Sequence, residues 1–174
     1  MKKSKWRDII EMGVFFGVCI LLNTQVFGVA RIPSGSMKPT INIGDVAAIN
    51  KLATKYEDPS RGDVVVFLRE RKLPQNEYWI KRVVALPNET VDIKDGHVYI
   101  DGALLEEEYA VGVTRISSYG IAFPYTVPEN HYFLMGDNRE HSEDSRVIGA
   151  INRDDITAIG AFKIYPFNDI GEIE

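Results

Sequence analysis

The stretch YWIKRVVALPNETVDIKDGHVYIDG, residues 78 to 102, decides the fold class of this chain. From Thr90 onward it consists of two runs in which apolar and polar residues alternate, separated by Asp95-Gly96. That dipeptide is favoured in two-residue turns, because both turn positions need a positive φ. The sequence therefore predicts a β-hairpin, preceded by a strand at Tyr78 to Leu86 that is rich in β-branched and aromatic residues.

Further strands are expected on both sides of this hairpin, because the flanking runs are also rich in valine, isoleucine and aromatic residues. The expected strands are Asp45 to Lys51, Gly62 to Leu68, Asn130 to Gly136 and Ile156 to Phe167. No window after Ala30 keeps a 3.6-residue apolar period, so no long helix is expected there. The acidic run Glu106 to Glu108 is interpreted as a solvated loop. Residues 31–174 are predicted to form one mainly β, antiparallel domain.

Composition excludes several classes of function. The chain has 174 residues and a net charge of −5, with its basic residues scattered along the sequence, so a nucleic-acid-binding surface is not expected. The single cysteine, Cys19, excludes an intramolecular disulfide and a cysteine-based zinc site. The three histidines are far apart in the sequence and do not form a metal-binding motif. No metal and no cofactor are expected.

The N-terminus has the pattern of a membrane segment. Four of its first seven residues are basic, and the chain is then mostly apolar from Met12 to Ala30. As a helix, this run would measure roughly 28 Å at about 1.5 Å per residue, close to the thickness of a bilayer core. The basic residues would keep the N-terminus in the cytoplasm and send the following domain across. The small residues Gly28-Val29-Ala30 leave open the alternative of a cleavable secretory signal.

The decapeptide RIPSGSMKPT, residues 31–40, places two serines around a glycine directly after this apolar run. Pro33 favours an extended backbone before it, and Gly35 permits a sharp turn between Ser34 and Ser36. A serine hydroxyl is a weak nucleophile unless a neighbouring base removes its proton. Alone, the motif is typical of an ordinary loop, so a catalytic role requires a base from elsewhere in the chain.

Lys81 is the candidate base. Strand alternation places Trp79 and Lys81 on one face and Ile80 and Arg82 on the other, so one of the two cations is expected to point inward. Burial disfavours the charged form of a lysine, and a pKa lowered from about 10.4 toward roughly 7 to 8 would make it a general base at neutral pH. The alternative is a side chain that reaches solvent along the strand.

The stretch MGDNREHSEDSR, residues 135–146, is the third candidate element, because it is dense in hydrogen-bonding side chains. Asp144 and Arg146 are expected to form a charge-assisted pair that holds the loop, and Ser142 could orient a neighbouring amine. A solvated polar loop is the alternative.

The three elements occur together, in order and behind an apolar segment. In this respect the chain closely resembles the type I signal peptidases, the membrane-bound Ser-Lys proteases that remove signal peptides. The resemblance extends to about Gly149 and is closest to the compact, Gram-positive-like members, because the stretch before Asn130 is short. The family usually has LPGD where this chain has LPNE. Asn88 tolerates the left-handed conformation, so the turn is expected to persist.

The resemblance implies a role for each matching residue. Ser36 matches the nucleophile and Lys81 the general base, while Ser34 matches the hydroxyl that forms the oxyanion hole with the backbone N–H of Ser36. Ser142 matches the residue that orients the lysine, and Asp144 with Arg146 the pair that stabilises the site. The matching positions for the apolar substrate pocket are Ile32, Met37, Trp79 and Ile80.

The implied protein is a single-pass membrane endopeptidase that cleaves signal peptides from exported preproteins after small residues, at sites of the Ala-x-Ala type. Its implied partners are these signal peptides and membrane lipid, without nucleic acid, metal or cofactor. Residues 1–30 would form the cytoplasmic start and retained anchor, and residues 31–174 the extracytoplasmic catalytic domain.

Three alternatives stay open. A LexA-like self-cleaving protein would use the same Ser-Lys chemistry, although this chain begins with an apolar segment where such a regulator needs a helix-turn-helix. A triad could pair His141 with Ser36. A membrane-anchored β-module that binds peptides would carry no catalytic activity.

Overall fold

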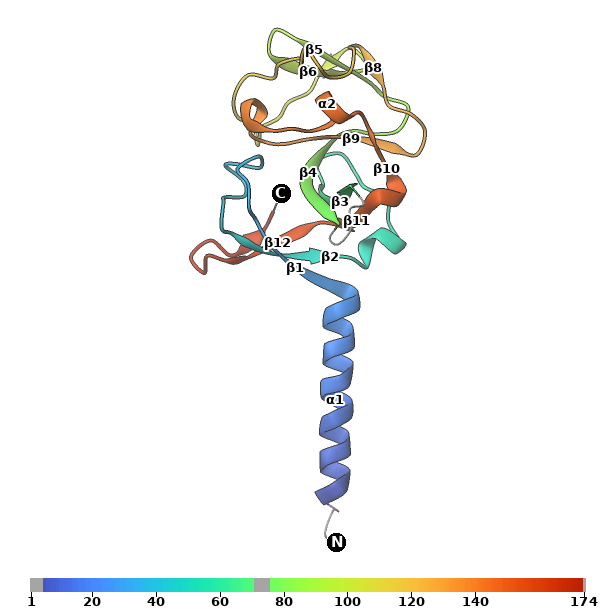
Figure 1. Cartoon of the computed structure of the whole chain (residues 1–174), viewed down its shortest axis with the longest axis vertical. Coiled ribbons are helices and arrows are strands. Elements are labelled where there is room, and N and C mark those ends of the chain that lie inside the picture. Colours follow the sequence, from blue (N-terminus) through green and yellow to red (C-terminus); the bar gives the residue numbers. More distant parts are fainter. Residues whose placement is uncertain (1–4, 71–75, 174) are drawn as a thin grey trace.

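A computed structural model describes residues 5–70 and 76–173; Lys2 and Lys3 of the expected basic start lie outside these ranges. Helix α1 (Lys5–Val26) projects away from a β-rich body that contains the other described residues (Figure 1). All pairs between named strands of this body are antiparallel. The predicted mainly β, antiparallel fold class is confirmed.

The strands form three sheets. The first sheet has the order β1 (Phe27–Arg31), β2 (Val46–Asn50), β12 (Ala161–Tyr165) and β13 (Gly171–Glu172). The second has the order β10 (Ile151–Asn152), β9 (His131–Met135), β4 (Glu77–Ala85), β3 (Val64–Glu70) and β11 (Ile156–Ile159). The third has the order β7 (Ala103–Leu104), β6 (His97–Ile100), β5 (Thr90–Lys94) and β8 (Tyr125–Thr126). The short helices are η1 (Ala53–Lys55), η2 (Arg139–His141), α2 (Ser145–Ile148) and η3 (Arg153–Asp155).

The predicted hairpin is present as β5 and β6. Its turn residues Asp95 and Gly96 have φ values of 50° and 82°, the positive values that the dipeptide was expected to supply. The turn at Asn88 also persists, with φ at 69°. An asparagine therefore takes the left-handed position at this turn.

The apolar N-terminal run is not helical to Ala30 as predicted. The helix ends at Val26, and Phe27–Arg31 form strand β1, which pairs along its length with β2. The backbone of β2 supplies partners for this segment, so sheet pairing replaces the last turn of the expected helix. Among the residues whose side chains are described, the structure contains no helix that is both long and apolar enough to cross a membrane.

The run predicted as one strand from Ile156 to Phe167 is two strands in different sheets. Gly160 separates them with a φ of +77°, a conformation that glycine adopts without steric penalty. Its N–H donates to the carbonyl of Val64 at 2.9 Å, which ties the corner to β3. The chain thereby passes from the second sheet, through β11, into the first sheet, through β12.

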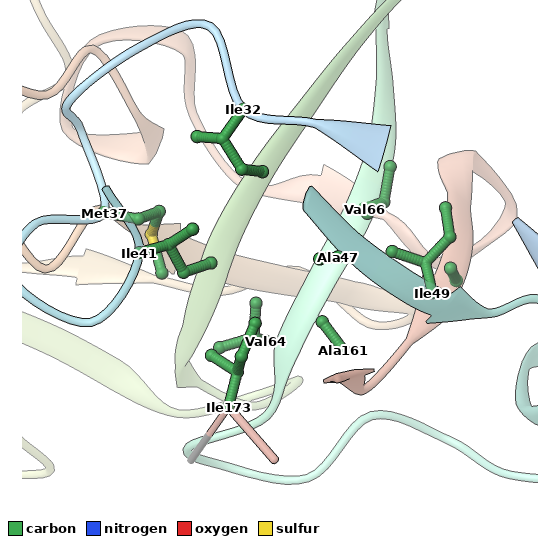
Figure 2. Packing of buried hydrophobic residues seen from close by; sticks show 10 residues of the cluster. Ile32, Met37, Ile41, Ala47, Ile49, Val64, Val66, Ala161 and Ile173 are labelled. Atoms are coloured by element: carbon green, nitrogen blue, oxygen red, sulfur yellow. The ribbon is translucent and has the colours of Figure 1, made fainter. Parts of the chain in front are cut away.

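The loop between β1 and β2 is anchored in the hydrophobic core. Its residues Met37 and Ile41 are completely buried and belong to a cluster with side chains of β2, β3 and β12, including Ala47 and Val64 (Figure 2). Burying a side chain of this size stabilises the fold by about 1.5–3 kcal/mol. Ser36 immediately precedes Met37, so core packing fixes the backbone that carries the serine.

Candidate active site

The structure places the side chains of Ser36 and Lys81 in direct contact. Lys81 Nζ and Ser36 Oγ are 2.8 Å apart, and both residues are buried, with exposed fractions of 4% and 6%. Ser36 comes from the loop between β1 and β2, and Lys81 from β4, the central strand of the second sheet. Because Lys81 is paired in register with Val65 of β3, its backbone is held by the sheet.

Burial lowers the pKa of Lys81 from 10.5 to about 8. The carboxylates of Asp144, Asp137 and Glu143 act in the opposite direction, but removal of the ammonium from water is the larger effect. Besides Ser36, the amine contacts the carbonyl oxygen of Ile80 at 3.2 Å. A lysine with this pKa is partly uncharged near neutral pH, which allows its nitrogen to accept a proton.

Ser34 lies on the open side of the same pair. Its Oγ is 3.4 Å from Ser36 Oγ, and Ser34 is exposed whereas Ser36 is buried. The backbone N–H of Ser36 makes no hydrogen bond to another residue in the described part of the chain. A hydroxyl therefore lies next to the serine oxygen, and the N–H of the serine is left available to donate to another group.

Asp144 and Arg146 form a buried, bidentate ion pair beside the lysine. Arg146 Nε and Nη2 donate to the two carboxylate oxygens of Asp144, each at 2.9 Å. Asp144 also accepts from the N–H of Gly136 at 3.0 Å, so the pair binds the loop to the end of β9. The Ser142 hydroxyl donates to the carbonyl of Glu143 at 3.5 Å, and it makes no hydrogen bond to Lys81 within the described residues.

A cavity of about 420 Å³ opens over the serine and the lysine. Trp79 and Ile80, two of the four expected pocket residues, contribute to its wall. The other two, Ile32 and Met37, lie in the hydrophobic core, and Ile32 also borders a separate surface hollow. The complete lining of the cavity is Pro33, Ser34, Ser36, Glu77, Tyr78, Trp79, Ile80, Lys81, His141 and Glu143.

Comparison with known proteins identifies the family. The sequence model described as signal peptidase, peptidase S26, matches residues 6–165. The chain belongs to this family. The signal peptidase I of Leptolyngbya laminosa is 34% identical over 170 residues, which cover 95% of this chain and 82% of the relative. The signal peptidase I of Bacillus licheniformis is 33% identical over 176 residues, covering 95% and 90%. A solved signal peptidase I from Enterococcus faecalis has 32% sequence identity and a TM-score of 0.48, covering 59% of this chain and 97% of that one.

Family membership confirms the predicted activity: the chain is a signal peptidase, a serine endopeptidase of the hydrolase class.

Sequence reasoning missed a second buried ion pair in the peptidase. Arg82 donates from Nε and Nη2 to the two carboxylate oxygens of Asp137, at 2.9 and 2.8 Å. Asp137 also accepts from the Thr40 hydroxyl at 2.6 Å. One cation of β4 was expected to point inward, but Lys81 and Arg82 are both buried, because β4 is an interior strand covered on both faces.

The acidic run Glu106 to Glu108 was expected to be a solvated loop, but it is solvated only in part. Glu106 and Glu108 are exposed, but Glu107 accepts two hydrogen bonds from Arg139, at 2.7 and 2.6 Å, with both side chains almost completely buried. Arg139 Nε also donates to the carbonyl of Gly136. The contact between Glu107 and Arg139 joins residues 32 positions apart, so no local pattern in the sequence indicated it.

Proposed function

We propose that Ser36 and Lys81 are the catalytic pair of this signal peptidase, with Ser36 as nucleophile and Lys81 as general base. The observation that carries this proposal is the 2.8 Å separation of Ser36 Oγ and a buried lysine nitrogen whose pKa is lowered to about 8. The uncharged amine accepts the hydroxyl proton as Ser36 Oγ attacks the carbonyl carbon of the scissile peptide bond.

The attack produces a tetrahedral intermediate with a negatively charged oxygen. The backbone N–H of Ser36 and the hydroxyl of Ser34 donate hydrogen bonds to this oxyanion. When the intermediate collapses, the C–N bond breaks and the Lys81 ammonium gives its proton to the leaving amine. A water molecule, deprotonated by the neutral lysine, then hydrolyses the ester to Ser36. The chemistry needs neither a metal nor a cofactor.

The remaining polar residues support this pair. Asp144 and Arg146 hold the loop that follows β9 against the lysine, through the bidentate contact and the bond to Gly136. Ser142 belongs to the same loop, and its hydroxyl would orient the amine in place of its contact with the Glu143 carbonyl. Trp79 and Ile80 offer apolar walls to the small side chains that precede the cleavage site. The substrates are exported preproteins with signal peptides ending in sites of the Ala-x-Ala type.

We further propose that α1 anchors the enzyme in a membrane, with the N-terminus in the cytoplasm and residues 31–174 on the opposite side. The support is the exposure of large apolar side chains on all faces of this helix, which projects away from the β-rich body (Figure 1). These side chains are Ile9, Ile10, Met12, Val14, Phe15, Phe16 and Val18. Resistance to alkaline extraction and protection of the N-terminus from added protease in sealed vesicles test this arrangement.

Cleavage of a preprotein by variants of the full chain in detergent tests the catalytic pair. Ser36→Ala and Lys81→Ala are each expected to lower kcat by about 1,000-fold or more, and N-terminal sequencing of the product locates the cleaved bond. His141→Ala is expected to cost less than about tenfold, because the His141 ring bonds to Asn138 rather than to the serine. If His141→Ala lowers kcat as much as Lys81→Ala does, the result would favour a histidine base and refute the proposed pair.

A further inference from the structure

The peptide group between Gly35 and Ser36 is held by two hydrogen bonds on its carbonyl side. The Gly35 carbonyl oxygen accepts from Asn138 Nδ2 at 3.1 Å and from the N–H of Lys38 at 3.2 Å. The backbone N–H of Asn138 donates to the next carbonyl, that of Ser36, at 3.0 Å. Asn138 therefore contacts the nucleophile loop at two successive carbonyls, although it lies about 100 positions away in the sequence.

The carbonyl of Gly35 and the N–H of Ser36 belong to the same planar peptide unit. In a trans peptide these two bonds point in opposite directions, so fixing one fixes the other. The donors on Gly35 thus decide where the Ser36 N–H points, and this N–H has no hydrogen-bond partner within the described residues. Glycine adopts a wide range of backbone angles, so Gly35 by itself offers little resistance to a rotation of this peptide plane.

The imidazole of His141 fixes the amide of Asn138. His141 Nδ1 lies 3.3 Å from Asn138 Oδ1, and with a proton on Nδ1 it donates to that oxygen. Because Oδ1 is engaged in this way, the Nδ2 side of the amide faces the Gly35 carbonyl. The 3₁₀-helix η2, which follows Asn138, brings the two side chains together.

We propose that Asn138 is a positioning residue that holds the Gly35–Ser36 peptide plane so that the Ser36 N–H faces the oxyanion of the transition state, and that His141 sets the orientation of the Asn138 amide. This inference rests on the proposed role of Ser36. The expected loss of kcat can be bounded, because complete loss of one oxyanion-hole donor typically lowers kcat by about 100- to 1,000-fold. Lys38 still holds the peptide when the Asn138 side chain is removed, so a smaller effect is expected.

The variants Asn138→Ala and Asn138→Asp of the full chain in detergent test this proposal. Each is expected to lower kcat by about 10- to 100-fold with KM within about twofold of wild type, since only the transition state carries the oxyanion. Asn138→Asp keeps the shape of the side chain and places an acceptor against the Gly35 carbonyl oxygen. It therefore provides the test if Asn138→Ala does not fold. His141→Ala is expected to lower kcat by about two- to tenfold.

A readout specific to the oxyanion separates positioning from general damage. A peptide aldehyde that adds to Ser36 forms a tetrahedral adduct whose oxygen occupies the oxyanion hole, whereas a non-cleavable peptide of the same sequence does not. The Asn138 variants should weaken binding of the aldehyde by about the factor lost in kcat and leave binding of the non-cleavable peptide unchanged. Asn152→Ala is the matched control, because the Asn152 side chain caps η3 and does not border the catalytic cavity.

The outcomes distinguish this inference from the proposed catalytic pair. If Ser36→Ala is inactive and both folded Asn138 variants keep kcat within twofold, the positioning role is refuted and the catalytic pair stands. Equal weakening of the aldehyde and the non-cleavable peptide also refutes it, since the variant would then have disturbed the whole cavity. Wild-type activity of Ser36→Ala would instead refute the catalytic pair, and the inference with it.

Discussion

Replacement of Lys81 by methionine is expected to abolish activity and at the same time to stabilise the folded enzyme at neutral pH. Methionine has a similar length and is apolar, so it fills the space of a side chain that is 4% exposed without placing an amine there. Activity depends on the nitrogen that lies 2.8 Å from Ser36 Oγ, and kcat should fall by about 1,000-fold or more.

The size of the stability change follows from the pKa of Lys81. A pKa lowered from 10.5 to about 8 means that the protonated lysine destabilises the folded state by about 3 kcal/mol at pH 7, at about 1.4 kcal/mol per unit. Methionine removes this cost but also removes the hydrogen bond to Ser36, which contributes about 1 kcal/mol. The net gain for Lys81→Met is therefore about 2 kcal/mol at pH 7.

The gain should depend on pH in a defined direction. Between pH 8 and 10.5 the unfolded lysine still carries a proton that the folded lysine has lost, so the wild-type protein becomes more stable as the pH rises through this window. Below pH 8 both states are protonated and the cost is fully present. The advantage of Lys81→Met should thus shrink by about 3 kcal/mol between pH 8 and 10.5 and reverse near the upper end.

Urea unfolding of the full chain in detergent, followed at pH 7, 8, 9 and 10, measures this difference. Lys163→Met is the control, because Lys163 is also buried but contacts Asp169 at 2.7 Å, the Thr40 carbonyl at 3.0 Å and Asp45 at 3.5 Å. Its replacement leaves Asp45 buried without its cation and should destabilise the protein by about 3 kcal/mol. A Lys81→Met variant that is less stable than wild type by the same amount at every pH would refute the desolvation argument.

Three further predictions concern the same site. The kcat/KM of the wild-type enzyme should rise about tenfold per pH unit below pH 8 and level off above it, because Lys81 acts in its unprotonated form; a profile that is flat from pH 6 to 9 would contradict this. Ser34→Ala should lower kcat by about 100-fold without changing the melting temperature, since its hydroxyl is exposed beside the serine oxygen; unchanged kcat would exclude it from the oxyanion hole. Gly136→Ala should lower the stability of the fold by about 1–3 kcal/mol and should also lower kcat. The new Cβ would clash with the Ser142 hydroxyl and lie 2.5 Å from the Ser36 carbonyl oxygen. Thermal denaturation and steady-state kinetics together detect these two effects.

Local patterns predicted the elements of the fold better than their boundaries. The Asp95-Gly96 turn was predictable because the conformation of a two-residue hairpin is set by those two residues. The break at Gly160 was not, since the same apolar run would also suit one long strand, and only the carbonyl of Val64 on another strand shows why the chain turns there. The end of α1 at Val26 likewise depends on pairing with β2, which lies more than 15 residues further along the chain.

The candidate site was predictable where the chemistry requires a particular residue type. Lys81 was a candidate because a nucleophilic serine needs a base, the family resemblance selected Ser36 as that serine, and the structure brings the two together. The supporting contacts depend on register instead. Arg82 meets Asp137 only because β4 and β9 are adjacent, with Arg82 opposite Met135, two residues before the aspartate. A single sequence does not contain that register.

The pKa of Lys81 stays lowered although two buried ion pairs, Arg82–Asp137 and Arg146–Asp144, contribute carboxylates that act on it. The carboxylates of Asp137 and Asp144 raise the pKa of Lys81, but by less than burial lowers it. Each of these carboxylates accepts hydrogen bonds from two guanidinium nitrogens of an arginine, Arg82 in one case and Arg146 in the other. The positive charge of Arg146 also lowers the pKa of the lysine. The arginines therefore hold the two aspartates in place, and Arg146 in addition partly offsets the effect of the carboxylates on the amine, so that burial remains the dominant effect on its pKa.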